Sequence, residues 1–232
     1  MFRFKHFKID DSLSAMKIGT DGVLLGAWAR VDGCSSVLDV GTGTGLIALM
    51  VAQRSAQATI TAIDIDAAAA SEARHNADGS PWGDRIVTLQ ADVRSYSPSQ
   101  RFDHIVSNPP YFVDSMLSPD AARSVARHTT SLSFEELVDA AERLLCDGGR
   151  LSVVLPVDGA ARFRRVAFGR LWLSRQCDVY SREGEMPKRV LIEFVRTTEP
   201  QMPRCDTIAI YDANGGYTEK YRCLTEDFYL SF

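Results

Sequence analysis

The sequence has few of the features that mark secreted, membrane or metal-binding chains. Only five of its 232 residues are cysteine and four are histidine, all widely spread and without a C-x-x-C pair. This pattern predicts reduced thiols and no metal site. No run approaches the roughly 18 consecutive apolar residues of a membrane helix, and the basic N-terminus lacks the apolar stretch of a secretory signal. We therefore expect a cytoplasmic protein with no metal and no membrane partner.

The composition is typical of one globular domain. Hydrophobic residues make up 45% and charged residues 24% of the chain, and the net charge is −4. Dedicated nucleic-acid-binding domains are usually basic, so any surface for a polyanion must be local. We predict a single domain over 1–232, with an N-terminal arm and edge helix (1–34), a core (35–196) and a C-terminal extension (197–232).

Short β-rich runs alternate with helical patterns, which predicts an α/β fold with a doubly wound sheet. The segment REGEMP between the last two runs is short enough to favour an antiparallel hairpin at the end of the sheet. The clearest helix is 133–149, where Ser133 and Glu136 can form a capping box. The seven expected strands are 35–40, 58–64, 85–90, 102–108, 150–156, 171–181 and 188–196.

A glycine-rich turn, DVGTGTG, lies between the first predicted strand and the next helix. Gly41, Gly43 and Gly45 would allow a sharp turn and close approach of a ligand to the backbone. The pattern is neither the dinucleotide G-x-G-x-x-G nor a phosphate-binding loop with Lys-Ser/Thr. It favours a nucleotide cofactor without a pyrophosphate, and a tight packing turn is the alternative interpretation.

Acidic residues end the next two predicted strands. A carboxylate at Asp64 can accept both hydroxyl protons of a ribose, as in dinucleotide-binding folds. Asp92 could accept a hydrogen bond from an adenine amino group. Each residue alone could be a simple strand-end cap. Because the carboxyl ends of parallel strands share one edge, the glycine turn and the two acids together favour a ligand there.

The fourth predicted strand ends in Asn108-Pro109-Pro110-Tyr111. Two prolines supply no N–H and fix φ, so the turn is rigid and presents carbonyl groups. The Asn108 amide can donate and accept hydrogen bonds, and the Tyr111 ring can stack on a base. This arrangement suits a planar amine whose two N–H protons are accepted by the Asn108 oxygen and a carbonyl. A plain strand-ending turn is the alternative.

The series DVGTGTG, AIDID, ADV and SNPPY resembles the motifs of the Rossmann-like, S-adenosylmethionine-dependent amino-methyltransferases. Four further segments are similar to the bacterial tRNA1(Val) (adenine-37-N6)-methyltransferase family: MKIGTDGVLLGAW, RHTTSLSFEELV, MPKRVLIEF and LTEDFYL. The resemblance covers nearly the whole chain. It implies a seven-stranded Rossmann-like methyltransferase sheet, S-adenosyl-L-methionine as cofactor and a tRNA substrate.

The resemblance also implies roles for individual residues. The target nitrogen would be held by Asn108, Pro109, Pro110 and Tyr111. The cofactor would be held by Lys17, Thr20, Asp39, Gly41, Gly43, Gly45, Asp64, Ile65, Asp92, Val93 and Asn108, with Lys17 and Thr20 at its methionine end. From the residues alone, Thr20 and Asp21 could instead simply cap the helix that begins near them.

Basic residues are concentrated in two segments that could contact RNA. Residues 1–8 alternate three basic residues with three phenylalanines, a pattern that can hold a backbone and stack bases. Residues 159–196 contain nine basic and only four acidic residues in a chain that is acidic overall. A solvated surface is the alternative for any single arginine. Further candidates after the Asn-Pro-Pro-Tyr turn are Arg123, Arg127 and His128.

Three other functions share parts of this pattern. A methyltransferase for a release-factor glutamine also uses an Asn-Pro-Pro-Tyr turn, but that family carries an extra N-terminal helical domain and only 38 residues precede Asp39. A guanine-N2 rRNA or DNA adenine methyltransferase is the second, although DNA enzymes usually add a recognition domain. The third is a cofactor-binding protein that has lost catalysis, which the complete turn argues against. A monomer is favoured.

Overall fold

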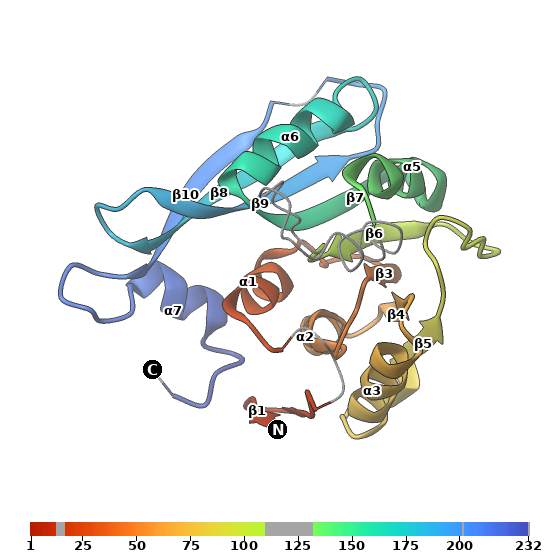
Figure 1. Ribbon diagram of the computed structural model, residues 1–232, viewed down its shortest axis with the longest axis horizontal. Helices are drawn as coiled ribbons and strands as arrows, with labels where there is room; N and C mark the ends of the chain where they lie inside the picture. Colours follow the sequence, from red (N-terminus) through yellow and green to blue (C-terminus); the bar gives the residue numbers. More distant parts are fainter. Residues whose placement is uncertain (13–16, 110–131, 201, 232) are drawn as a thin grey trace, which may run out of the picture.

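Within the residues that the computed structural model describes (1–12, 17–109, 132–200 and 202–231), a mixed eight-stranded sheet forms the centre of the molecule (Figure 1). Its strand order is β10-β8-β9-β7-β6-β3-β4-β5. The strands are β3 (Ser36–Val40), β4 (Thr59–Asp64), β5 (Ile86–Gln90), β6 (Phe102–Ser107), β7 (Leu145–Pro156), β8 (Trp172–Arg182), β9 (Pro187–Val195) and β10 (Arg204–Tyr211).

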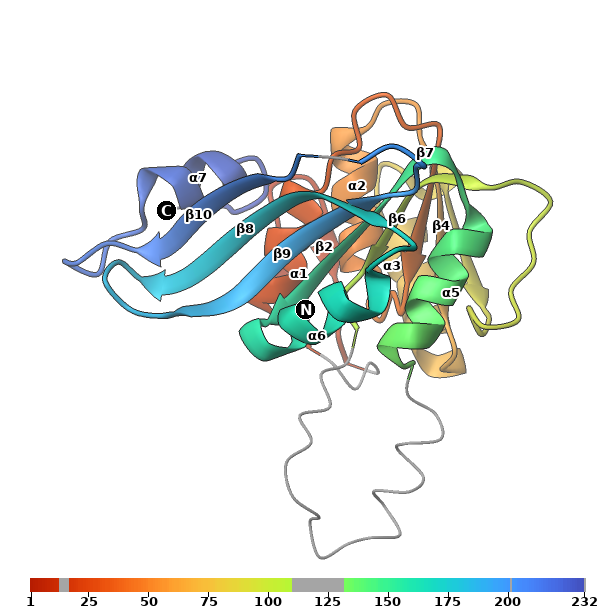
Figure 2. The ribbon, with the colours of Figure 1, turned by 90° about the horizontal axis from the view of Figure 1, so that it is seen from above.

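The predicted strands and the predicted hairpin are confirmed. Strands β3 to β7 pair in parallel, and β9 runs antiparallel to both β7 and β8, so that β8 and β9 form the hairpin. The segment predicted as a C-terminal extension adds an eighth strand to the described sheet, because β10 pairs in parallel with the exposed edge of β8. Figure 2 shows β8, β9 and β10 curving away from the rest of the sheet, with a short helix beside β10.

Helices cover both faces of the sheet (Figure 1). On one face lie α1 (Thr20–Trp28), α2 (Leu46–Arg54) and α3 (Ala67–Asp78), and on the other lie α5 (Phe134–Leu144) and α6 (Val157–Ala167). The described buried apolar side chains form two clusters, one for each face. Helix α1 approaches α2 closely, since a Cβ at Gly26 would lie 2.7 Å from the Met50 sulfur. The remaining short elements are β1 (Phe2–Arg3), β2 (Lys8–Ile9), the 3₁₀ turn η1 (Gly83–Arg85) and α7 (Glu219–Thr225).

The helix predicted over 133–149 is shorter than expected. Its capping box is present, but α5 ends at Leu144 and residues 145–149 belong to β7. Leu145 pairs with Phe102 of β6. Gly148 donates to the Arg196 carbonyl at 2.8 Å and has a left-handed φ of 78°. Pairing with the neighbouring strands therefore ends the helix before its two glycines.

The aromatic residues of the N-terminal arm are mostly part of the core. Phe4 and Phe7 are buried and stack at a centroid distance of 4.6 Å. Phe4 also stacks on Tyr229, and the Lys5 N–H donates to the Phe228 carbonyl, which joins the two ends of the chain. The expectation that these phenylalanines stack on bases is therefore wrong for Phe4 and Phe7, because their rings are covered.

A fully buried histidine lies on β6 beneath the end of α1. One ring nitrogen of His104, Nδ1, lies 2.8 Å from the Arg30 carbonyl oxygen, and Nε2 lies 2.9 Å from the Ser152 hydroxyl. A carbonyl only accepts, so Nδ1 carries the proton and Nε2 accepts from Ser152. Burial lowers the pKa of His104 to about 4.

We predict that His104 makes the fold sensitive to acid. Below the ordinary histidine pKa of 6.5, the unfolded chain binds a proton that folded His104 excludes until its own pKa of about 4. The free energy of unfolding should therefore fall as pH decreases through this window, by up to about 3 kcal/mol. Urea unfolding between pH 7 and pH 4.5 should show a smaller decrease for His104→Gln than for the wild type. Equal decreases in the two proteins would contradict this role.

Candidate active site

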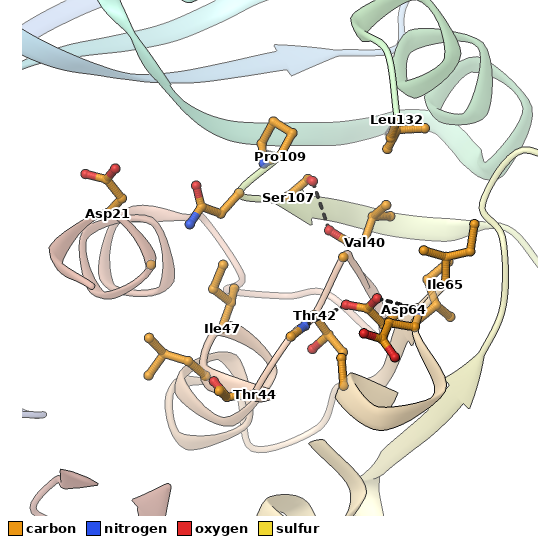
Figure 3. Close-up of a pocket in the computed structure, with 18 of the residues that line it drawn as sticks. Asp21, Val40, Thr42, Thr44, Ile47, Asp64, Ile65, Ser107, Pro109 and Leu132 are labelled. Carbon is orange, nitrogen blue, oxygen red and sulfur yellow. Dashed lines mark hydrogen bonds between the residues drawn. The ribbon is translucent and has the colours of Figure 1, made fainter. Parts of the chain in front are cut away.

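A cavity of about 730 Å³ lies at the carboxyl ends of the parallel strands, between α1, the loop after β3 and the ends of β4, β5 and β6 (Figure 3). Most of the predicted site residues meet there although they are distant in sequence. Those that line the cavity are Lys17, Thr20, Gly41, Gly43, Asp64, Ile65, Asp92, Val93, Asn108 and Pro109.

Two predicted site residues that the structure describes, Asp39 and Gly45, do not belong to this lining. Asp39 is fully buried below the loop. Gly45 faces α3, where an added Cβ would lie 3.3 Å from the Cβ of Ala73. Pro110 and Tyr111 lie outside the described residues.

The glycine-rich loop has the left-handed backbone that its sequence predicts. Gly41, Gly43 and Gly45 have φ values of 68°, 55° and 81°, which side-chain-bearing residues rarely adopt. A Cβ at Gly41 or Gly43 would meet no atom within 4 Å, so the loop backbone faces open space. A ligand can therefore approach the peptide groups closely.

Asp39 holds this loop against the start of α2. One carboxylate oxygen, Oδ2, accepts from the Thr42 hydroxyl at 2.6 Å and from the Ala48 N–H at 3.2 Å. The other, Oδ1, has no hydrogen-bond partner within the described part of the chain. Burial raises the pKa of Asp39 to about 7, against the lowering effect of its two donors. Its position makes it a support of the loop.

Asp64 connects the ends of the first two central strands. Its Oδ2 accepts from the Gly43 N–H at 2.9 Å, and its Oδ1 accepts from the Asp66 N–H at 3.0 Å (Figure 3). The carboxylate therefore braces the loop while its side chain lines the cavity. The neighbouring Ile65 is 46% exposed, which places an apolar surface beside the carboxylate.

The carboxylate of Asp92 is already paired. Arg94 donates to it through Nε at 2.8 and 2.9 Å and through a second guanidinium nitrogen at 2.6 Å. Hydrogen bonding from Arg94 keeps the pKa of Asp92 below its usual range. Arg94 also reaches Glu136 of the capping box at 3.5 Å. The ion pair between Asp92 and Arg94 was not predicted from the sequence, where only the short separation of the two residues indicates it.

The end of β6 supplies the opposite part of the cavity. Ser107 donates to the Val40 carbonyl at 2.9 Å, which fastens the end of β6 to the end of β3 (Figure 3). Asn108 is half-buried and Pro109 is buried, and both line the cavity. Asn108 and Pro109 therefore border the same space as Asp64.

Among the lining residues that were not predicted from the sequence, Asp21 and Arg189 form an ion pair. Asp21 does not cap α1, since the N-cap is Gly19 and no side chain caps it. Instead, Asp21 accepts from Nε of Arg189 at 2.8 Å. Arg189 belonged to the predicted basic segment, but its pairing with a residue 168 positions away depends on the tertiary fold.

The described residues also bear on the expectations about cysteines, metal sites and membrane helices. Each of the five cysteines is free. No group of three potential ligands among the described residues is placed to hold a metal ion. Among the same residues, no helix combines the length and the hydrophobicity needed to cross a membrane.

Comparison with known proteins first shows the general class of the protein. A family model for the methyltransferase small domain matches residues 22–158. A predicted O-methyltransferase from Agrobacterium tumefaciens has a TM-score of 0.72 at 22% identity, over 90% of this chain and 96% of that chain. The N-methyltransferase NodS from Bradyrhizobium japonicum, solved with S-adenosyl-L-homocysteine, has a TM-score of 0.53 at 18% identity, over 75% of this chain and 83% of that chain. These two structures show that the fold is shared.

Sequence relatives are more specific. The tRNA1(Val) (adenine(37)-N6)-methyltransferase of Bacteroides thetaiotaomicron is 46% identical over 99% of this chain and 97% of its own length. The protein with the same name in Tolumonas auensis is 40% identical over 99% of this chain and 96% of its own. The chain belongs to the tRNA1(Val) (adenine(37)-N6)-methyltransferase family, within the methyltransferase small-domain family.

We predict that alanine is tolerated less well at Gly45 than at a left-handed glycine with open space around it. Gly45→Ala should combine the cost of a left-handed alanine, about 1 kcal/mol, with contact against Ala73. Gly33→Ala is the matched control, because Gly33 has a similar φ of 75° and open space around it. Urea unfolding should show a larger loss of stability for Gly45→Ala than for Gly33→Ala. Equal losses would mean that the contact with α3 does not matter.

Proposed function

We propose that this chain transfers a methyl group from S-adenosyl-L-methionine to N6 of adenine 37 in tRNA1(Val). The observation that carries the proposal is that one cavity holds both the Asp64 carboxylate beside the glycine loop and the Asn108-Pro109 turn. The names of the full-length relatives support the choice of RNA and base. A tRNA substrate is consistent with a cytoplasmic protein.

The donor set of the cavity fits the nucleoside part of the cofactor. Asp64 offers a carboxylate at the end of β4, where it could accept from both ribose hydroxyls. Open space above Gly41 and Gly43 leaves room for a ligand against the loop backbone. Ile65 and Val93 provide apolar surface for a planar base. Asp92 could accept from the adenine amino group, in which case it shares its oxygens with Arg94.

The methionine end of the cofactor would lie toward α1. Lys17 and Thr20 line the cavity at the start of this helix. An ammonium and a hydroxyl are suitable partners for a carboxylate. The bound cofactor would supply an electrophilic methyl group, so the protein mainly has to position the acceptor.

Asn108 and Pro109 would prepare the accepting nitrogen. The lone pair of adenine N6 is delocalised into the ring and is therefore weakly nucleophilic. The Asn108 amide oxygen and the Pro109 carbonyl can accept its two protons, which favours a more tetrahedral nitrogen with an available lone pair. Turning a base out of an RNA loop costs a few kcal/mol. Stacking on Tyr111, which lies outside the described residues, would offset part of this cost.

We predict that Asp64→Ala weakens S-adenosylmethionine binding by about 1.5–3 kcal/mol, because charge-assisted hydrogen bonds to the ribose are lost. Calorimetric titration measures the change. Asp103→Ala is the matched control, because Asp103 also accepts two backbone N–H groups, from Ser35 and Ser36, but does not line the cavity. Unchanged affinity in Asp64→Ala, or tight binding of NAD by the wild type, would refute the cofactor assignment.

We predict that Asn108→Ala lowers the rate of methyl transfer by about 10²–10³, by analogy with removing one preorganised hydrogen-bonding group. The rate constant of methyl transfer should fall by a larger factor than the tRNA affinity, because Asn108 acts on the amine nitrogen as that nitrogen changes geometry in the transition state. Single-turnover kinetics with a tRNA transcript separates the two effects, with the melting temperature of the same variant as a check on folding. A rate within a few-fold of the wild type would make the turn purely structural.

A further inference from the structure

The ion pair between Asp21 and Arg189 has no part in the function proposed above. The Arg189 Nε lies 2.8 Å from the Asp21 Oδ2, and the two side chains are 36% and 24% exposed. Both residues line the cavity. Asp21 belongs to the first turn of α1, whereas Arg189 lies near the start of β9, opposite Pro156 at the end of β7. The pair thus joins two elements at the wall of the site.

The pair is on the side of the cavity that the nucleoside of the cofactor leaves open. Figure 3 shows Asp21 across the cavity from Asp64 and Ile65, with Pro109 between Asp21 and Leu132 along the upper wall. Ribose and adenine are assigned to the Asp64 side. The methionine end is assigned to Lys17 and Thr20, and Thr20 directly precedes Asp21 in α1. The ion pair therefore lies where the methionine end of the cofactor would meet the turn that receives the target base.

Arg189 differs from the other basic residues of 159–196 in its contacts and in its location. Five of the other eight make contact with groups outside the segment, including Arg162, which lies over the Phe134 ring. Arg170 pairs with Asp139 and Glu142, Arg196 pairs with Asp147, Arg175 lies over Trp28 beside Glu193, and Arg182 donates to the Asp212 and Ala213 carbonyls. Within the described residues, Arg189 is the one member of the nine that lines the cavity.

A nucleotide that inserts its base into this cavity brings its phosphate with it. The lining carries the carboxylates of Asp21, Asp64, Asp66 and Asp92 and, besides Arg189, the cations Lys17 and Arg94. Lys17 is assigned to the methionine end and Arg94 is paired with Asp92, so Arg189 is the cation of the described lining that remains for a phosphate. A guanidinium matches phosphate geometry well. A partly exposed ion pair contributes little net free energy, so its arginine can change partner at small cost.

We propose that Arg189 binds a phosphate of the RNA nucleotide whose base enters the cavity, and that Asp21 competes with this phosphate for the guanidinium. The inference rests on the proposed function. In the free protein, Arg189 neutralises Asp21 and fastens β9 to α1. In the complex, Arg189 turns from the carboxylate to the phosphate.

The test uses opposite effects of two neutral substitutions on tRNA affinity, measured by filter binding of a tRNA transcript over a range of salt. Arg189→Met should weaken binding about tenfold and lower the slope of log affinity against log salt by about 0.7–0.9, the value for one phosphate contact. Asp21→Asn should strengthen binding several-fold, because the competing carboxylate is gone. Arg189→Lys should retain the slope while losing part of the affinity.

A second Arg–Asp pair provides the matched control. Arg196 lies just beyond the end of β9 and pairs with Asp147, roughly 20 Å from Arg189 along the strand. Arg196→Met and Asp147→Asn should leave tRNA affinity and its salt slope unchanged.

The outcomes separate this inference from the proposed function. If Asp21→Asn and Arg189→Met both weaken binding, or if Arg189→Met keeps the wild-type slope, the pair is structural and the inference is wrong. If the wild-type chain methylates no tRNA, the proposed function itself fails. Cofactor affinity, measured by calorimetry, should equal that of the wild type in Arg189→Met, Asp21→Asn, Arg196→Met and Asp147→Asn.

Discussion

The cavity depends on a constraint that two adjacent parallel strands impose on the chain. Because β3 and β4 run side by side, the loop after β3 and the carboxylate that ends β4 meet at one edge of the sheet. The hydrogen bond from the Gly43 N–H to Asp64 fixes that meeting point. Asp39 supports the same loop from below. Under the proposed function, Asp64 therefore shapes the loop and also binds the ligand that the loop receives.

Local patterns predicted most of the fold because they depend on few neighbours. Alternation and apolar runs located all seven predicted strands, and the capping box at Ser133 located the start of α5. Pairing between distant segments accounts for what was missed. Residues 145–149 join β6 instead of extending α5, and Arg204–Tyr211 becomes a strand because β8 presents an unpaired edge. An edge strand such as β10 buries few side chains, so its sequence shows little alternation of apolar and polar residues.

The site was predictable to the extent that strand ends determine it. Gly41, Gly43, Asp64, Asp92 and Asn108 converge because the parallel topology brings their strand ends together. The Asp21–Arg189 pair was not predictable, since it requires β9 to return antiparallel beside β7. The prediction that Phe4 and Phe7 of the N-terminal arm stack on bases was wrong, because the sequence shows which residues are aromatic but not which of them are buried. The roles of Pro110 and Tyr111 stay predictions.

Under the proposed function, one cavity presents adenine N6 of a tRNA to a methyl donor. The most direct measurement incubates the purified chain with unmodified tRNA1(Val) transcript and S-adenosylmethionine carrying an isotope-labelled methyl group, followed by nuclease digestion and mass spectrometry. We expect one label, in N6-methyladenosine of the fragment that contains position 37, and no label when that adenine is replaced by guanine. Label in 2-methylguanosine, label in protein glutamine, or cofactor binding without any transfer would contradict the proposed function.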